Sequence, residues 1–177
     1  MCMTLYHNEF EQLESKDSFK AQTWFGDRKS LVEKYAWAVP NDTVIEYIAE
    51  HKQVQELGAG SGYWTHELRK AGARVRAIDI DPPEDTWSRV IEGDESLIDE
   101  LPLLLVWPPV HSSMAYDALR EHAASGGSDV FYVGEWDGCT ANKQFHMTLE
   151  HEYEFVKSID LPSYKHIYDN FYHYRKV

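Results

Sequence analysis

The chain has 177 residues, of which 43% are hydrophobic, and it carries a formal net charge of −13. This length suits one domain with a proper core and is too short for two. The negative charge disfavours nucleic acid as a partner, because proteins contact a phosphate backbone through clustered Lys and Arg. Its two cysteines cannot form a disulfide framework or, alone, a zinc site. No apolar run is long enough to span a membrane, and the N-terminus does not resemble a signal peptide. We therefore expect a cytoplasmic protein without a membrane segment.

Residues 1–50 are predicted to form a helical lead-in to the domain. Residues 1–27 are polar, acidic and weakly periodic, so we expect irregular structure there with one short helix. Ser30 and Thr43 each match the first position of a capping box, with a glutamate three residues later. The pattern predicts two short helices that begin at these residues.

The remaining residues, 53–177, alternate between strand and helix patterns. The predicted strands cover 53–57, 74–80, 89–92, 101–107, 129–135, 153–162 and 170–177, and the predicted helices cover 62–71, 114–124 and 140–150, the last one capped by Thr140. A further short helix is expected between 82 and 100. This alternation predicts an α/β fold, an open doubly wound, mostly parallel sheet with helices on both faces and an antiparallel strand at the C-terminal end. We treat 1–177 as one domain, with 53–177 as its ligand-binding core.

Three glycines follow the first predicted strand, at Gly58, Gly60 and Gly62. Glycines at such a position allow a sharp turn with positive φ and let a ligand lie against main-chain atoms at the start of the next helix. Asp79, about 20 residues further on, ends the next strand, where a carboxylate can accept from both hydroxyls of a ribose. A nicotinamide dinucleotide is disfavoured, because Tyr63 stands where its fingerprint requires a third glycine.

The stretch ELGAGSG, together with the acid in VRAIDI, resembles motif I of the class I (Rossmann-like) S-adenosylmethionine-dependent methyltransferases. The resemblance implies S-adenosyl-L-methionine as the cofactor, with the glycine turn against its amino-acid part, Asp79 on the ribose, Asp94 near the adenine and Glu56 near the amino group. The cofactor-binding residues that it implies are Glu56, Gly58, Ala59, Gly60, Gly62, Asp79 and Asp94. An acidic site suits the sulfonium and the ammonium of this cofactor. With KYAWAVPN, LLLVWPP and FYVGE, the chain is similar to a little-characterised group of small methyltransferase-like proteins.

The segment VWPPV, residues 106–110, lies at the end of the fourth predicted strand, where class I enzymes place residues that face the substrate. It resembles the (D/N)-P-P-(aromatic) motif of amino-group methyltransferases. It departs from that motif at both informative positions, since Trp107 replaces the hydrogen-bond acceptor and Val110 the aromatic residue. An indole donates one hydrogen bond and cannot orient an amine. Methylation of nucleic-acid bases is therefore not carried over to this chain.

Methyl transfer needs an aligned nucleophile and, for some nucleophiles, a base. Trp107 and Pro108 are the candidates for the turn at which the acceptor enters. His111 after that turn and Glu135 at the end of the next strand are the candidate bases. A soft or already neutral amine nucleophile would need neither of them.

Nine histidines raise the question of a metal site. His146 and His151 form the closest pair worth testing, but their spacing does not place two ligands side by side on a helix, so we expect no metal. The resulting hypothesis is a methyltransferase that acts on a small molecule or a protein side chain. Three alternatives stay open: a cofactor-binding protein or partner subunit without methyl transfer, an enzyme that cleaves the cofactor, and a dinucleotide oxidoreductase. The sequence identifies neither the acceptor nor the oligomeric state.

Overall fold

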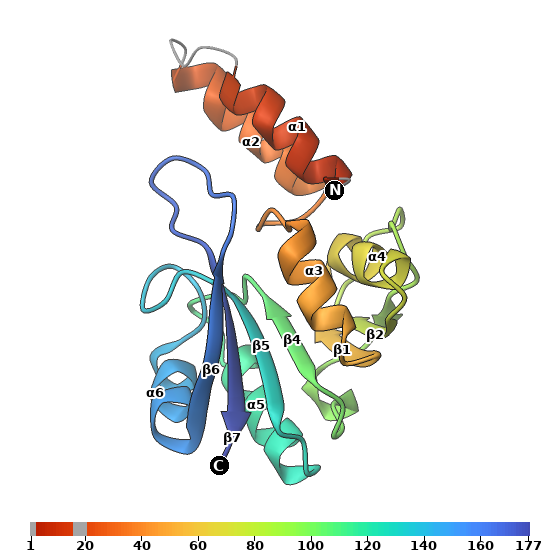
Figure 1. Ribbon diagram of the computed structural model, residues 1–177, viewed down its shortest axis with the longest axis vertical. Helices are drawn as coiled ribbons and strands as arrows, with labels where there is room; N and C mark the ends of the chain where they lie inside the picture. Colours follow the sequence, from red (N-terminus) through yellow and green to blue (C-terminus); the bar gives the residue numbers. More distant parts are fainter. Residues whose placement is uncertain (1–2, 16–20) are drawn as a thin grey trace.

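The computed structural model describes residues 3–15 and 21–177 (Figure 1). The helices are α1 (Leu5–Ser15), α2 (Ala21–Lys34), α3 (Asp42–Ala49), α4 (Tyr63–Lys70), α5 (Met114–Ala124), α6 (Lys143–Glu152) and the 3₁₀ helix η1 (Glu95–Leu97). The strands are β1 (Gln53–Leu57), β2 (Arg74–Asp79), β3 (Ile91–Glu92), β4 (Leu103–Val106), β5 (Asp129–Gly134), β6 (Tyr153–Asp160) and β7 (Asn170–Lys176). In this part of the chain, no helix has both the length and the apolar character that crossing a membrane requires.

The strands form one sheet in the order β3-β2-β1-β4-β5-β7-β6. β1 to β5 pair in parallel, and β7 runs antiparallel to both β5 and β6. The predicted open α/β sheet with an antiparallel C-terminal part is therefore confirmed. The strand order reverses between β1 and β4, and in open α/β sheets ligands bind outside the carboxyl ends of the strands at such a point.

Helices cover both faces of the sheet, as the doubly wound prediction requires. One core joins α3 and α4 to the sheet and contains Ile48, Leu68 and Leu104. The other joins α5 and α6 to the opposite face and contains Leu105 and Phe145. Adjacent residues of β4 point into different cores because successive side chains of a strand face opposite sides of the sheet. This explains why the segment LPLLLVW is apolar throughout instead of alternating between apolar and polar residues.

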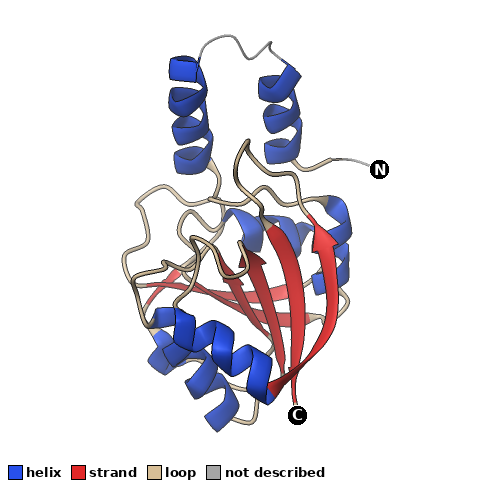
Figure 2. Ribbon diagram, turned by 90° about the vertical axis from the view of Figure 1, so that its left-hand side faces the viewer, coloured by secondary structure: helices blue, strands red, loops and turns tan. Residues whose placement is uncertain are grey.

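The N-terminal segment differs from the prediction. Irregular structure with one short helix was expected, whereas the described residues form two helices, α1 and α2. They stand beyond the carboxyl end of the sheet (Figures 1 and 2). Tyr6 of α1 is fully buried, stacks on Tyr35 at 4.7 Å between ring centroids, and its backbone N–H donates to the Tyr63 hydroxyl at 3.0 Å. These aromatic contacts stabilise helices that weak local periodicity does not predict. The predicted cap at Ser30 is wrong, since this residue lies inside α2.

Two further predicted caps are each wrong by two residues. α3 is capped by Asn41 rather than by Thr43, and α6 is capped by Asn142 rather than by Thr140. In α6 the Asn142 side chain accepts a hydrogen bond from the Phe145 N–H at 3.0 Å. The Thr140 hydroxyl is buried and accepts instead from the Glu135 N–H at 3.0 Å, so it stabilises the turn after β5. Asparagine ranks above threonine as a cap, which agrees with the observed starts.

Replacing Asn142 by alanine is expected to lower the free energy of unfolding by about 1 kcal/mol, because the Phe145 N–H loses its acceptor. Asn142→Asp keeps an acceptor in the same place and serves as the control. Chemical denaturation of the three proteins measures the difference. Equal stability of the alanine variant and the wild type would contradict the assigned cap.

Candidate functional site

Two adjoining cavities open beside the carboxyl ends of β1 and β4. The first, the α2 cavity, has a volume of about 200 Å³ and is lined by Val32, Glu33, Tyr35, Glu56, Ser61 and neighbouring residues. The second, the β4 cavity, has a volume of about 370 Å³ and is lined by Asp79, Asp94, Trp107, Pro108, Pro109 and neighbouring residues. Both share Trp37, Gly58, Gly60 and Val106, so they form one groove at the point where the strand order reverses.

The glycine turn between β1 and α4 forms the centre of this groove. Gly58, Gly60 and Gly62 all have left-handed backbones, with φ of +76°, +50° and +71°. A Cβ atom at Gly62 would lie 3.0 Å from the Ser88 carbonyl oxygen, whereas one at Gly60 would meet nothing within 4 Å. Conformation therefore favours glycine at both positions, and packing adds a second reason at Gly62. At Gly60 the missing side chain leaves the main chain open to the groove.

Asp79 ends β2 and orients the glycine turn. Its Oδ2 accepts from the Gly60 N–H at 2.7 Å, and its Oδ1 accepts from the Asp81 N–H at 3.0 Å. The carboxylate lines the β4 cavity together with Asp94. Asp94 is exposed, and hydrogen bonds from the hydroxyl and the N–H of Ser96 lower its pKa. Two carboxylates therefore lie at the end of the groove away from α2.

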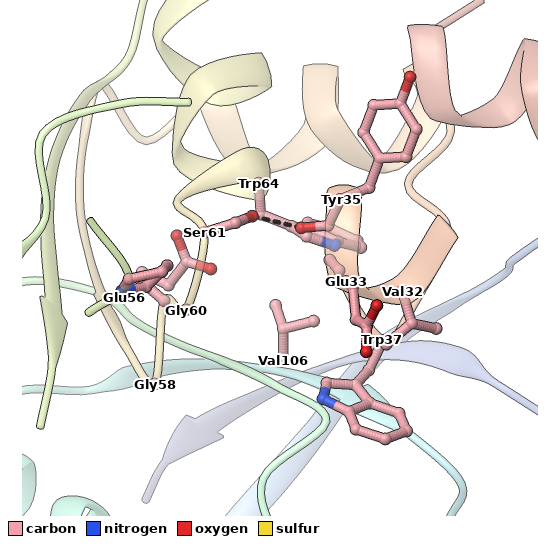
Figure 3. Close-up of a pocket in the computed structure, with 13 residues that line it drawn as sticks. Val32, Glu33, Tyr35, Trp37, Glu56, Gly58, Gly60, Ser61, Trp64 and Val106 are labelled. Atoms are coloured by element: carbon pink, nitrogen blue, oxygen red, sulfur yellow. Dashed lines mark hydrogen bonds between the residues drawn. The ribbon is translucent and has the colours of Figure 1, made fainter. Parts of the chain in front are cut away.

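Glu56 places a buried carboxyl in the α2 cavity, and only 2% of the residue is exposed (Figure 3). Desolvation raises its pKa to about 7, although the Thr65 hydroxyl donates a hydrogen bond to it at 2.5 Å. The nearby Asp79 raises the pKa further. The hydroxyl and the backbone N–H of Thr65 and the charge of Arg69 offset this burial only in part, so a positively charged ligand group would find an incompletely compensated acid here.

The segment that follows α2 contributes to the groove and is tied to the glycine turn. The Ser61 hydroxyl donates to the Tyr35 carbonyl oxygen (Figure 3). Glu33 and Trp37 extend toward the same space, Glu33 from the last turn of α2 and Trp37 from just beyond it. The last turn of α2 and the residues that follow it therefore help to enclose the groove.

Trp107 follows β4 and has a left-handed backbone, with φ of +51°, which is uncommon for a large side chain. Its ring stacks on Trp37, with 5.3 Å between the centroids and 11° between the planes. Its Nε1 donates to Asp169 Oδ1 at 2.5 Å. Asp169 is 5% exposed, and burial raises its pKa to about 7. The indole is thus fixed by a buried acid on one side and an aromatic ring on the other.

Sequence reasoning missed Asp169, although one signal was present. Asp169 directly precedes β7, which is antiparallel to β5. An antiparallel strand begins at the edge where the parallel strands end, so the residue before it reaches the carboxyl edge of the sheet. The predicted C-terminal antiparallel strand was therefore enough to place Asp169 at the carboxyl edge of the sheet.

The four candidate catalytic residues separate into two pairs. Trp107 and Pro108 line the β4 cavity. His111 is exposed and lines neither cavity. Glu135 is buried outside both cavities, where its Oε1 accepts from the Tyr168 N–H at 2.9 Å and its Oε2 from the Cys139 N–H at 3.3 Å. The structure thus places the first pair in the groove and leaves the two predicted bases outside it.

Comparison with solved structures shows that the fold of this chain resembles that of methyltransferases. No protein-family model matches the sequence, and no curated protein is similar enough to count as a relative. Among solved structures, the magnesium protoporphyrin IX methyltransferase of Synechocystis PCC 6803, with S-adenosylhomocysteine bound, superposes with a TM-score of 0.61 at 11% identity. This match covers 97% of this chain and 94% of the other. The chain has the Rossmann-like fold of methyltransferases.

Two further structures support the same fold. A putative RNA methyltransferase of Pyrococcus horikoshii superposes with a TM-score of 0.52 at 16% identity and covers 99% of this chain and 98% of its own. The N-methyltransferase NodS of Bradyrhizobium japonicum WM9 gives a TM-score of 0.51 at 14% identity, covering 76% and 93%. At these identities the likeness concerns the fold and leaves the chemistry to be argued from the groove.

Glu56→Gln is expected to be more stable than the wild type at pH 8 and to lose most of this advantage at pH 4. The folded-state pKa of about 7 lies above the ordinary value of 4.5, so the wild type loses stability as the pH rises between these values. The variant does not titrate there, and the gap should grow by about 3 kcal/mol. Urea denaturation across this pH range measures it. A gap that does not change with pH would show that the carboxyl is not desolvated.

Proposed function

We propose that the chain is a methyltransferase that takes a methyl group from S-adenosyl-L-methionine and transfers it to a small molecule or a protein side chain. The observation that carries the proposal is the groove itself. It joins a glycine turn, a buried carboxyl at Glu56 and an oriented carboxylate at Asp79 at the point where the strand order reverses.

The residues of the groove fit this cofactor by shape and by charge. We assign the α2 cavity to the methionyl part, with Glu56 near the ammonium and the turn from Gly58 through Ala59 and Gly60 to Gly62 against the main chain of the ligand. We assign Asp79 to the ribose hydroxyls and Asp94 to the adenine end. When bound, the cofactor supplies an electrophilic methyl group on a sulfonium. The acidic groups suit its two positive charges, whereas a dinucleotide would bring a pyrophosphate to the same acids.

The remaining side chains of the groove would exclude water and hold the acceptor in line with the methyl group. Trp37 and Val106 lie where the two cavities meet, and Trp107 and Pro108 continue this surface into the β4 cavity. A methyl group held at the junction of the cavities would face these residues. Because α2 and the residues after it complete the α2 cavity, we further propose that residues 1–177 act as one domain.

The known structures agree with this assignment at the coarse level. The magnesium protoporphyrin IX methyltransferase was crystallised with S-adenosylhomocysteine and also with S-adenosylmethionine, and the second structure superposes with a TM-score of 0.60 at 10% identity. The fold is also similar to that of NodS, which is an N-methyltransferase. These proteins support the cofactor class for this chain and leave its acceptor open.

A second candidate function is cofactor binding without methyl transfer, in a regulatory or partner subunit. The positions of His111 and Glu135 favour it, since neither base lines the groove. Prolonged incubation with S-adenosylmethionine and a cell extract, followed by mass spectrometry, separates the two functions. Methylated products support transfer, and unchanged cofactor supports binding alone.

Asp79→Ala is expected to weaken binding of S-adenosylmethionine by about 1–3 kcal/mol, because the ligand hydroxyls lose a charged acceptor. Isothermal titration measures the affinity. Asp81→Ala removes an exposed carboxylate two residues away and is the matched control, expected to bind as the wild type does. A folded Asp79→Ala protein with unchanged affinity would remove Asp79 from the site.

A further inference from the structure

The surface at the junction of the two cavities is aromatic and aliphatic. Trp37 and Val106 belong to both cavities, and Trp107, Pro108 and Pro109 adjoin them in the β4 cavity. Ser112 adds a hydroxyl, which already accepts from the Met114 N–H at 3.1 Å. Asp79 and Asp94 are assigned above to the nucleoside. The other side chains at the junction of the cavities, where we place the methyl group, offer an apolar surface.

Acids and bases near this surface are engaged elsewhere or lie in solvent. The Trp107 N–H donates to Asp169, and both carboxylate oxygens of Glu135 accept backbone N–H groups. His111 lies outside both cavities. Glu33 lines the α2 cavity, but its side chain is 66% exposed and lies 3.6 Å from the Lys29 ammonium. Its carboxylate is therefore solvated and paired with a lysine. The acceptor should therefore have no proton to lose.

Positive charge near the indoles disfavours a cationic acceptor. The Arg28 guanidinium carbon lies 5.8 Å from the Trp37 ring centroid and 5.9 Å from that of Trp107. An ammonium at this surface would meet both this guanidinium and the sulfonium of the cofactor. An anion is not favoured either, because it would meet the carboxylates of Glu33, Asp79 and Asp94, which line the same groove. Charge thus selects an uncharged acceptor.

Trp37 presents an aromatic face to such an acceptor. It is 52% exposed, although its ring is held parallel to Trp107, which is in turn held by Asp169. An exposed ring in a fixed plane favours stacking with another flat ring, since the contact needs little further ordering of the side chain. The arrangement resembles the platforms on which aromatic bases stack.

We infer that the methyl acceptor is a flat, uncharged heteroaromatic ring with an unprotonated, pyridine-type nitrogen, stacked on Trp37 at the junction of the cavities. The inference rests on the proposed function and names its substrate class. In the reaction, the nitrogen lone pair forms the new N–C bond while the S–C bond breaks and its electron pair stays on sulfur. The products are an N-methylated ring cation and S-adenosylhomocysteine, and no proton is released.

The test uses the full chain and begins with isothermal titration of S-adenosylhomocysteine. Absence of binding at this step contradicts the proposed function itself. With the product bound, saturation-transfer NMR compares quinoline, cyclohexylamine and benzoate as probes. Quinoline is expected to bind best, and Trp37→Leu is expected to weaken it about tenfold or more. Tyr168→Ala removes an aromatic side chain that is 76% exposed and should bind quinoline as the wild type does.

Turnover completes the test. With saturating S-adenosylmethionine, mass spectrometry should detect N-methylquinolinium, formed at a rate that does not change between pH 7 and 9, because the nucleophile carries no proton. Three results overturn the inference while the cofactor still binds: stronger binding of the amine or the carboxylate, undiminished binding of quinoline by a folded Trp37→Leu protein, or no methylation of quinoline, isoquinoline and pyridine. Methylation of diethyl sulfide in their place would overturn the requirement for a flat ring.

Discussion

The burial of the Glu56 carboxyl is the physical constraint on which the account of this site depends. A carboxyl that is 2% exposed, and that Thr65 and the charge of Arg69 compensate only in part, opposes folding at neutral pH through its desolvation. Such an arrangement is understandable where a ligand brings the missing positive charge. The glycine turn above it, oriented by Asp79, leaves room for that ligand against the main chain.

The rest of the fold positions this carboxyl and encloses it. β1 carries Glu56 to the centre of the parallel sheet, and α4 supplies the hydroxyl of Thr65. The helices α1 and α2 lie beyond the same edge, where the aromatic contacts of Tyr6 hold them. The turn after β4 and the residue before β7 add Trp107 and Asp169. Elements from both ends of the chain therefore meet at one groove.

The sequence predicts the sheet well because its signals there are local. The glycines, the alternation of strands and helices, and the doubly apolar β4 depend on neighbouring residues alone. The missed helix pair and the wrong cap at Ser30 depend on contacts across the fold, such as that between Tyr6 and Tyr35. The wrong caps at Thr43 and Thr140 have a local cause, because an asparagine two residues away caps each helix instead. The groove shows the same division. Trp107 and Pro108 follow from a local motif, whereas the pairing of Trp107 with Asp169 joins residues that the sequence separates widely.

Proton release on binding of S-adenosylmethionine tests the central claim most directly. Near pH 6.5 a carboxyl with a pKa of about 7 is mostly protonated, and an ammonium placed beside it should drive the proton off. Isothermal titration in buffers of different ionisation enthalpy measures this release. The account predicts that the wild type releases about three quarters of a proton more than Glu56→Gln, which is the protonated fraction of Glu56 at this pH. Equal proton release by the two proteins, with the cofactor bound by both, would contradict it.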